Sequence, residues 1–475
     1  MFVDREEELA ALETHYRSDK AELFILYGRR RVGKTELLRI FCQDKPHLFF
    51  VATTASREAQ LARFTEQLFS FQNMPAAGLV FRSWENAFER LAGLPGRPII
   101  VLDEFTYLVG GDSAVPSSLQ KSWDTTLRHS QVFLILCGSY VGMMEREAMS
   151  YRSPLYGRRT GSWMLSPLEP AAAAQFVPAY DPVQALETWA ILGGIPYYLE
   201  TFDDQLSVLA NVRRQIMHPR SLLHDEPRLL LMEELREPRN YFSILQAIAH
   251  GHTRRNEIAQ AAYLPANSAG KYLNVLQGLQ IVERRVPITE TRPAKSRRGI
   301  YRISDPFLRF WFRFVHPFKD RLELGWLDTV ISEEVEPHLD SFVSEAFEEA
   351  ALRYIARQVQ GGSLGFSLSH LGRWWSSEGQ IDLVGWNERS RELLVGECEW
   401  TKRPIGISTL DRLKTMVPYL PGGPWSRVTY ALFAKSGFTE ALRAQATKED
   451  ILLIAAEDLL GQLGKGTVQA SSNTR

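Results

Sequence analysis

The chain has 475 residues, with 55 Lys and Arg against 56 Asp and Glu, so its formal net charge is −1 at pH 7. This balance excludes a protein that attracts nucleic acid through its overall charge, and any attracting field must be local. A hydrophobic content of 45% and a charged content of 23% are typical of a soluble globular protein, and the length predicts about three domains.

Membrane insertion and secretion are not expected from the sequence. No apolar run approaches the ~20 residues that span a bilayer, and the first residues are acidic and lack the apolar segment of a signal peptide. The three cysteines, Cys42, Cys137 and Cys398, are far apart and form no metal-binding pair. These features predict a cytoplasmic protein without a membrane partner.

The first predicted strand and helix flank a glycine-rich loop. The apolar run 23–27 predicts a buried strand, the pattern 36–41 predicts a helix, and the loop between them fits Gly-x-x-x-x-Gly-Lys-Ser/Thr. In this context the motif is a phosphate-binding P-loop, whose backbone N–H groups surround the phosphates of ATP. We expect Lys34 to reach the β- and γ-phosphates and to act in catalysis, and Thr35 to hold Mg²⁺. The predicted nucleotide-binding residues are Gly28, Arg29, Arg30, Arg31, Val32, Gly33, Lys34 and Thr35.

Two acidic residues follow a later predicted strand. The run 98–102 is apolar without alternation, as in strands of a parallel sheet that is covered on both faces. Asp103 and Glu104 come at its carboxyl end, where ligands bind in open α/β sheets. We expect Asp103 to hold Mg²⁺ directly or through water, and Glu104 to act as general base toward the attacking water.

Three further residues are candidates for catalysis. Ser139 ends the predicted strand 131–139, and it either senses the γ-phosphate and positions water or caps the next helix. Arg158 and Arg159 follow the last core strand. They either supply an arginine finger that stabilises charge on the γ-phosphoryl group or are solvated surface residues.

Four features carry a resemblance to a known family: the P-loop, the strand ending in Asp103 and Glu104, the strand ending at Ser139, and the segment 153–159. Together they resemble the archaeal-type ATPases, in the AAA+ and STAND-like branch of P-loop NTPases. The resemblance implies binding and hydrolysis of ATP with Mg²⁺. It also implies that the opening residues pack near the adenine and that the Gly-Gly-x-Pro segment 192–199 lies in a helical lid.

Positive charge is concentrated in the middle of the chain. Residues 239–302 contain eleven Lys and Arg against three Asp and Glu, a net charge of 11 − 3 = +8. Three helical patterns between residues 241 and 279, followed by two short strands between 280 and 303, predict a winged helix. Such a domain either binds duplex DNA, with its basic wing on phosphates, or contacts only protein. The candidate DNA-binding residues are Lys271, Arg292, Lys295, Arg297 and Arg298.

The C-terminal part has a predicted helix at 341–358 and adjacent antiparallel strands at 380–386 and 392–400, followed by a further helix and strand. This order resembles the PD-(D/E)XK nuclease fold, which implies carboxylates that hold a second divalent ion, Mg²⁺ or Mn²⁺, beside a scissile phosphate. Glu399 stands where that pattern usually has a lysine, so the alternatives are a metal-dependent active site and an inactive scaffold. Without a cation, converging carboxylates repel and one pKa rises. The candidate metal ligands are Glu348, Asp382, Glu397 and Glu399.

We therefore expect an α/β protein with a P-loop NTPase parallel sheet, a helical lid, a winged helix and a C-terminal restriction-endonuclease-like α/β domain. The predicted domains are the ATPase core 1–165, the lid 166–235, the winged helix 236–305, the nuclease-like domain 306–463 and a disordered tail 464–475.

Three functions follow as hypotheses. The first is an ATPase that acts on or near DNA, whose nucleotide state controls the winged helix and the C-terminal domain. The second is a nucleotide-gated, metal-dependent DNA endonuclease. The third is a nucleotide-switched signalling or assembly scaffold, which forms a homo-oligomer or binds a protein partner.

Overall fold

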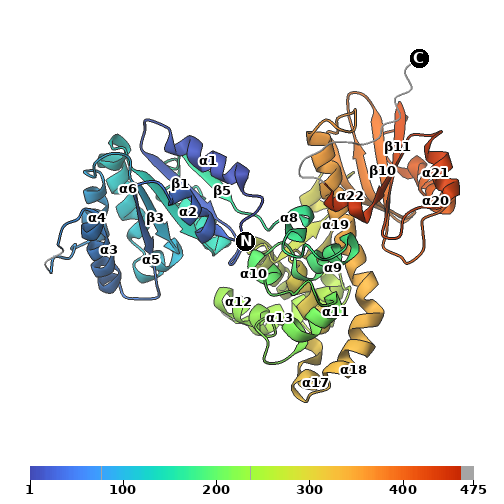
Figure 1. The fold of residues 1–475 in the computed structure, drawn as a ribbon, viewed down its shortest axis with the longest axis horizontal. Helices are drawn as coiled ribbons and strands as arrows, with labels where there is room; N and C mark the ends of the chain where they lie inside the picture. Colours follow the sequence, from blue (N-terminus) through green and yellow to red (C-terminus); the bar gives the residue numbers. More distant parts are fainter. Residues whose placement is uncertain (76–77, 236, 462–475) are drawn as a thin grey trace. The chain divides into compact units, whose positions relative to one another are not determined.

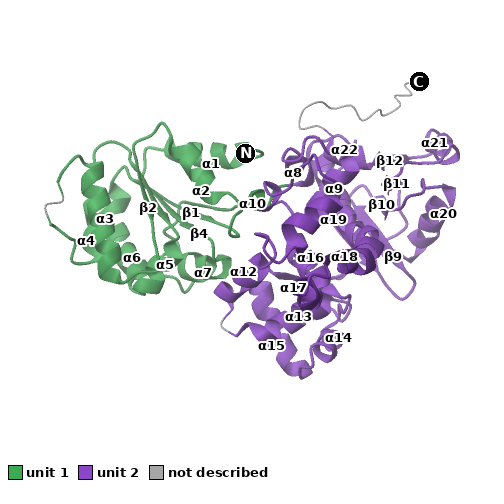
Figure 2. Cartoon of the chain, turned by 60° about the horizontal axis from the view of Figure 1, so that its bottom comes forward, with its two compact units in different colours: residues 1–168, 195–197 green, residues 169–194, 198–475 purple. Residues whose placement is uncertain are grey.

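The computed structural model describes residues 1–75, 78–235 and 237–461, and the predicted tail 464–475 lies outside this range. The chain divides into two compact units (Figure 2). The first unit comprises Met1–Leu168 with Ile195–Tyr197, and the second comprises Glu169–Gly194 and the described residues from Tyr198 onward. The finer division into five domains stays a prediction.

The first unit is built on a five-stranded parallel sheet with the strand order β2-β3-β4-β1-β5. The central strands β1, β3 and β4 are buried along their whole length, as their unbroken apolar runs predict. The strands are β1 (Glu22–Tyr27), β2 (His47–Val51), β3 (Ile99–Asp103), β4 (Phe133–Gly138) and β5 (Gly161–Met164).

Helices cover both faces of this sheet (Figure 1). On one face α1 and α2 pack through side chains such as Phe41, whose ring lies edge-on to Phe133. On the other face α3, α4, α5 and α6 bury a large apolar core that includes Phe64, Trp84 and Phe105. The helices are α1 (Glu6–Tyr16), α2 (Lys34–Cys42), α3 (Arg57–Phe71), α4 (Trp84–Leu91), α5 (Phe105–Gly111), α6 (Val115–Thr125) and α7 (Val141–Met144).

The strand order determines which loops meet. Strand β4 lies between β1 and β3, so the carboxyl ends of these three parallel strands are neighbours at one edge of the sheet. The P-loop follows β1, Ser139 follows β4, and Asp103 ends β3. Three segments that are far apart in the sequence therefore converge on one site, as the rule for ligand sites in parallel sheets predicts.

The second unit begins with short helices. Helix α9 starts with a capping box, in which the Asp181 side chain accepts from the backbone of Gln184 and the Gln184 side chain accepts from the backbone of Asp181. It ends at Gly193, whose φ of 69° suits a residue without a side chain. The helices are α8 (Pro170–Ala174), α9 (Pro182–Leu192), α10 (Pro196–Leu199, at the boundary of the units), α11 (Val208–Asn211) and α12 (Glu226–Glu234).

The basic middle region forms three helices followed by an antiparallel strand pair, as the sequence pattern predicts. The loop 286–299 joins the two strands and packs against the C-terminal sheet. The Ile288 N–H donates to the Arg373 carbonyl at 2.9 Å, and the Trp375 indole donates to the Arg298 carbonyl at 3.1 Å. The elements are α13 (Pro238–Ala249), α14 (Arg255–Ala261), α15 (Ala266–Gly278), β6 (Val282–Arg285) and β7 (Ile300–Ile303).

The C-terminal part is a five-stranded mixed sheet with the order β12-β11-β10-β9-β8. Strands β8, β9 and β10 are antiparallel neighbours, whereas β10, β11 and β12 are parallel, so the predicted antiparallel pair is confirmed. The elements are α16 (Pro306–Phe314), α17 (Lys319–Glu323), α18 (Leu327–Val330), α19 (Leu339–Gln360), β8 (His370–Trp375), β9 (Gln380–Trp386), β10 (Glu392–Glu399), α20 (Ile407–Met416), β11 (Arg427–Ala434), α21 (Glu440–Ala446), β12 (Ile451–Ala455) and α22 (Ala456–Leu460).

A search of the described residues for membrane-spanning helices gives none, because no helix there combines sufficient length with sufficient apolar character.

Candidate active site

Two glycines shape the P-loop. A Cβ atom at Gly28 would lie 2.4 Å from the carbonyl oxygen of Leu165, so only glycine fits there without displacing backbone. Gly33 has a φ of 100°, a conformation that other residues rarely adopt, and α2 begins at the next residue. The loop therefore ends at a helix N-terminus, whose free N–H groups and partial positive charge suit a phosphate.

Lys34 lies against the main chain of its own loop. Its Nζ atom donates to the carbonyls of Gly28 at 2.9 Å and Arg29 at 2.8 Å, and the residue is only 4% exposed. Burial lowers the pKa of the Lys34 amine, and nearby acidic groups oppose that shift. The amine is thus held at the inner wall of the loop, where it can bind phosphate oxygens.

The buried side chain of Arg5 holds the P-loop from outside the phosphate site. Arg5 donates to the carbonyls of Val32 at 3.3 Å and Ser166 at 2.9 Å, and it also pairs with Glu8 at 3.1 Å. The start of the chain is thereby bound to the P-loop and to the segment after β5. Arg5 directly precedes α1 and belongs to the opening segment that the family resemblance placed near the adenine, but the resemblance gave this arginine no role of its own.

The other loop arginines contact aromatic residues. Arg30 donates to the hydroxyl of Tyr107 at 3.3 Å, and the Arg31 guanidinium lies 4.2 Å from the centre of the Tyr197 ring. Tyr197 belongs to the predicted lid segment 192–199, and within the first unit it thus contacts the P-loop. A cation over an aromatic face is attracted by the electrons of the ring.

Thr35 and Asp103 meet at the carboxyl edge of the sheet. The Thr35 hydroxyl donates to Asp103 Oδ2 at 2.9 Å, and the other Asp103 oxygen accepts from the backbone N–H of Glu104 at 2.9 Å. A hydroxyl and a carboxylate are the hard oxygen ligands that Mg²⁺ prefers. The residues present therefore fit a nucleotide-bound Mg²⁺ ion.

Glu104 is held by Ser139. The Ser139 hydroxyl donates to Glu104 Oε1 at 3.0 Å, while Glu104 Oε2 is buried and accepts no hydrogen bond among the described residues. Helix α7 has Tyr140 at its N-cap and no side-chain cap, so the alternative in which Ser139 caps this helix is wrong. Glu104 also adopts a left-handed backbone, with a φ of 53°, which costs about 1 kcal/mol and is typical of functional sites.

The two candidate finger arginines differ in their surroundings. Arg158 binds both oxygens of Asp124 at distances from 2.7 to 3.0 Å and donates to the carbonyls of Pro154 and Tyr156. The Arg159 side chain is exposed. The structure therefore gives Arg158 a structural tether across the loop, whereas Arg159 is the one of the pair that remains available.

Comparisons with known proteins agree with this site. A family model described as an ATPase domain predominantly from Archaea matches residues 2–202, and a model of archaeal and bacterial proteins of unknown function matches residues 311–411. An uncharacterized protein of Methanocaldococcus jannaschii is 32% identical over 400 residues, which are 84% of this chain and 88% of that protein. An uncharacterized ATP-binding protein of the same organism is 58% identical over 45 residues, 10% of this chain and 76% of the relative.

Two solved structures are also similar. The Walker-type ATPase of Pyrococcus abyssi has a TM-score of 0.48 at 24% identity, over 66% of this chain and 96% of that one. The ORC2 protein of Aeropyrum pernix, solved in ADPNP and ADP complexes, has a TM-score of 0.46 at 13% identity, over 70% and 94%.

The fold and the site define a P-loop ATPase. The chain belongs to the archaeal-type ATPase family, as its match to the family model and to a relative over most of both lengths shows.

The C-terminal carboxylates also converge. Burial raises the pKa of Glu348 to about 7 against the opposing charge of Arg373, and repulsion from Asp382 adds to the shift. Burial raises the pKa of Asp382 to about 6, with repulsion from Glu397 adding to it, and burial likewise raises the pKa of Glu397. Burial is thus the main cause of these raised pKa values, and the mutual repulsion on which the sequence expectation rested is a smaller contribution.

Two arginines pair with carboxylates of this cluster. Arg373 pairs with Glu348 at 3.0 Å, and Arg412 pairs with Glu397 at 2.7 Å and with Glu399 at 3.4 Å. Within the described ranges, no group of three or more His, Cys, Asp or Glu residues is arranged to hold a metal ion. The second divalent metal therefore stays a prediction without support, and the two arginines are functional neighbours that the sequence pattern did not indicate.

The candidate DNA-binding residues lie on the surface of the second unit. Lys271 is on α15 and the others are in the loop 286–299, and all five are exposed. Arg298 pairs with Glu290 at 3.6 Å. A polar groove of about 1010 Å³ runs between α14, α15 and this loop, and its lining includes Arg254, Arg255, Arg284 and Arg297.

Proposed function

We propose that this ATPase binds Mg-ATP at the P-loop and hydrolyses it with Glu104 as general base. The buried, unpaired Glu104 Oε2 oxygen supports this role, since a base needs a free lone pair that faces the reacting water. Thr35 and Asp103 would hold Mg²⁺, which neutralises charge on the phosphates. Lys34 would bind the β- and γ-phosphates, and Arg159 would be the arginine finger.

We further propose that the ATPase acts on duplex DNA through the second unit. The observation that supports this is the groove between α14, α15 and the loop 286–299, because three of its lining arginines, Arg255, Arg284 and Arg297, form no ion pair among the described residues. Backbone phosphates are the natural ligand of such a groove, and side chains that contact phosphates position a protein without reading sequence.

The distribution of ion pairs separates two kinds of cation in this region. Four of the eleven Lys and Arg residues pair with acids: Arg254, Arg285, Arg298 and Arg302. The other seven form no ion pair among the described residues, and they are Arg239, Arg255, Lys271, Arg284, Arg292, Lys295 and Arg297. The net positive charge is thus directed to solvent rather than compensated inside the unit.

A salt titration tests this proposal. Anisotropy of a labelled duplex gives the slope of log K against log salt concentration, which should fall by about 0.9 for each phosphate contact removed. The double variant Lys271→Ala with Arg297→Ala should bind more weakly and with a shallower slope. The control Arg389→Ala with Arg403→Ala removes the same charge from exposed positions elsewhere in the unit. Equal affinity and slope in all three proteins would overturn the proposal.

The endonuclease hypothesis lacks comparable support. Glu348 and Glu397, two of the candidate metal ligands, are already paired with arginines, and a guanidinium placed there competes with a divalent ion. We therefore propose that the C-terminal domain binds rather than cleaves, with nucleotide state in the first unit altering how the second meets DNA or a protein partner.

A further inference from the structure

A small cavity in the second unit has three arginines and two histidines among its lining residues. It has a volume of about 190 Å³ and lies where the end of α13 and strand β7 meet α16 and α19. Its ionisable lining residues are Arg302, Arg309, Arg313, His250, His338 and Glu345. None of these residues belongs to the nucleotide site, the groove or the C-terminal acidic cluster.

Positive charge exceeds negative charge around this cavity. Glu345 is its single carboxylate, and it pairs with both Arg309 at 2.7 Å and Arg302 at 3.0 Å. Arg313 forms no ion pair among the described residues. Counting three arginines against one glutamate gives a local net charge of +2, and charges removed from water are costly unless they are paired.

One donor at the cavity has no partner. The Nε atom of Arg309 is buried and makes no hydrogen bond within the described part of the chain, although its Nη atoms bind Glu345 and the Phe342 carbonyl. Buried donors are nearly always satisfied, so this one marks Arg309 as an incompletely satisfied cation beside the cavity. The guanidinium also lies 4.4 Å from the centre of the Phe342 ring, which fixes its plane.

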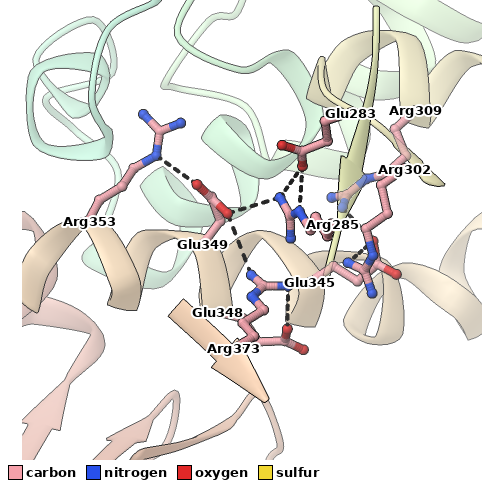
Figure 3. A network of polar contacts seen from close by, with 9 residues as sticks. All are labelled: Glu283, Arg285, Arg302, Arg309, Glu345, Glu348, Glu349, Arg353 and Arg373. Carbon is pink, nitrogen blue, oxygen red and sulfur yellow. Dashed lines mark hydrogen bonds and ion pairs between the residues drawn. The ribbon is translucent and has the colours of Figure 1, made fainter. Parts of the chain in front are cut away.

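A wider network keeps the cavity wall in place (Figure 3). From Glu345 on α19 the carboxylates Glu348 and Glu349 follow on the same helix, and Glu349 pairs with Arg285 of β6 at 3.0 Å and with Arg353 at 3.2 Å. The two ion pairs of Glu345 hold Arg302 and Arg309 in one geometry before any ligand arrives, which lowers the entropic cost of binding.

We infer that this cavity is a binding site for a phosphate group. Arg302, Arg309 and Arg313 offer planar forks of N–H donors that match the oxygens of a tetrahedral anion. The volume is about six times that of one water molecule in the liquid, so a phosphate with its nearest waters fits but a duplex does not. The phosphate is either free or the terminal group of a larger molecule.

The test uses the full chain with Lys34→Ala, which weakens phosphate binding at the P-loop in every sample. When this protein is titrated with inorganic phosphate in a calorimeter, the heat signal should show saturable binding. Adding Arg313→Met should weaken that binding at least about tenfold, since a charge-assisted hydrogen bond is lost. Arg313 has no ion pair to break, so the variant should fold; Ser341→Asp, which adds a carboxylate at the lining, is the second variant and should also lose binding.

Arg389→Met, in an exposed turn, is the matched control and should bind as the background does. Competition by a 5′-phosphorylated dinucleotide identifies a terminal phosphate as the ligand, and failure to compete identifies free phosphate. Equal phosphate affinity in the background, Arg313→Met and Ser341→Asp proteins would overturn the inference, as would the absence of saturable binding at millimolar phosphate.

Discussion

The two acidic sites of this chain treat their carboxylates in opposite ways. At the P-loop, Asp103 and Glu104 accept hydrogen bonds from hydroxyl groups and a backbone N–H, and neither forms an ion pair among the described residues. In the C-terminal cluster, Glu348 of α19 and Glu397 of β10 are ion-paired with arginines, while Asp382 between them accepts from the backbone N–H of Cys398. Both sites lie beside buried strands of α/β sheets, so the fold alone does not distinguish them.

The difference concerns where negative charge is available. Neutral donors orient a carboxylate without cancelling its charge, so a metal ion or a proton can still be attracted to it. A guanidinium orients the carboxylate and also neutralises its charge, so a divalent ion is only weakly attracted. A carboxylate held by neutral donors is therefore suited to bind a metal ion or accept a proton. A carboxylate paired with a guanidinium is suited to stabilise the fold.

The largest effect is expected from removing the proposed general base at the P-loop site. Glu104→Gln preserves the shape and the Ser139 contact but removes the base, so ATP turnover should fall by about 10²–10⁴-fold. Nucleotide affinity should stay within a few-fold, because Lys34 and the loop are intact. Steady-state phosphate release and equilibrium binding of a labelled nucleotide measure the two quantities. Undiminished turnover would assign the base elsewhere.

The next largest effect is expected from removing arginines that pair with the C-terminal carboxylates. The Arg373 side chain is 11% exposed, so Arg373→Met leaves Glu348 buried without its cation and should destabilise the second unit by about 3–5 kcal/mol. Arg412→Met removes a cation that is 53% exposed and should cost less than about 1 kcal/mol. Urea unfolding of both variants measures the difference. Equal costs would show that the two ion pairs are equally exposed to water in solution.

A pH titration sharpens the contrast further. Because the folded-state pKa of Glu348 is raised to about 7 from 4.5, the folded protein binds a proton that the unfolded chain has released between these values. Stability should therefore fall as pH rises from about 4.5 through about 7, by at most about 1.4 kcal/mol per pH unit for this group. In the Glu348→Gln variant, the calorimetric melting temperature of the second unit should depend less on pH over that window.

Asp382, with a pKa raised to about 6, contributes a slope of the same sign, so Glu348→Gln reduces the pH dependence without abolishing it. The exposed Glu378→Gln variant, at a residue with no ion pair among the described residues, should leave the profile unchanged. A profile that keeps its full slope in Glu348→Gln would place the titrating group elsewhere.

The smallest effect probes how Glu104 is positioned. Ser139→Ala removes one neutral hydrogen bond to Oε1, worth about 0.5–1.5 kcal/mol, so turnover should fall about two- to tenfold with nucleotide affinity unchanged. A tenfold loss of affinity instead would indicate that Ser139 contacts the nucleotide.

The sequence predicted the features that depend on local pattern. A glycine loop between a buried strand and a helix, and acids at the end of an apolar strand, are readable because each signal lies within a few residues. The helices and strands of the basic region, the helix at 341–358 and the strands at 380–386 and 392–400 were placed for the same reason, whereas shorter elements such as β8 and β12 were not predicted.

The contacts between distant residues could not be read in this way. Ser139 and Glu104 are 35 residues apart, Arg158 and Asp124 are 34 apart, and Arg5 reaches Ser166 across 161 residues. Nothing in the local pattern of an arginine tells whether it will face a phosphate or a carboxylate. Only the sheet order, which places β4 between β1 and β3, determines those partners.

The main-chain hydrogen bond from Ile288 to Arg373 has a mechanical consequence. It ties the loop 286–299 to strand β8, and the Arg284 guanidinium of β6 binds the carbonyls of Pro293 and Ser296 further along the loop. The loop is therefore fastened both to the strand pair that it joins and to the C-terminal sheet. The three-helix region and this sheet should accordingly melt in a single endotherm.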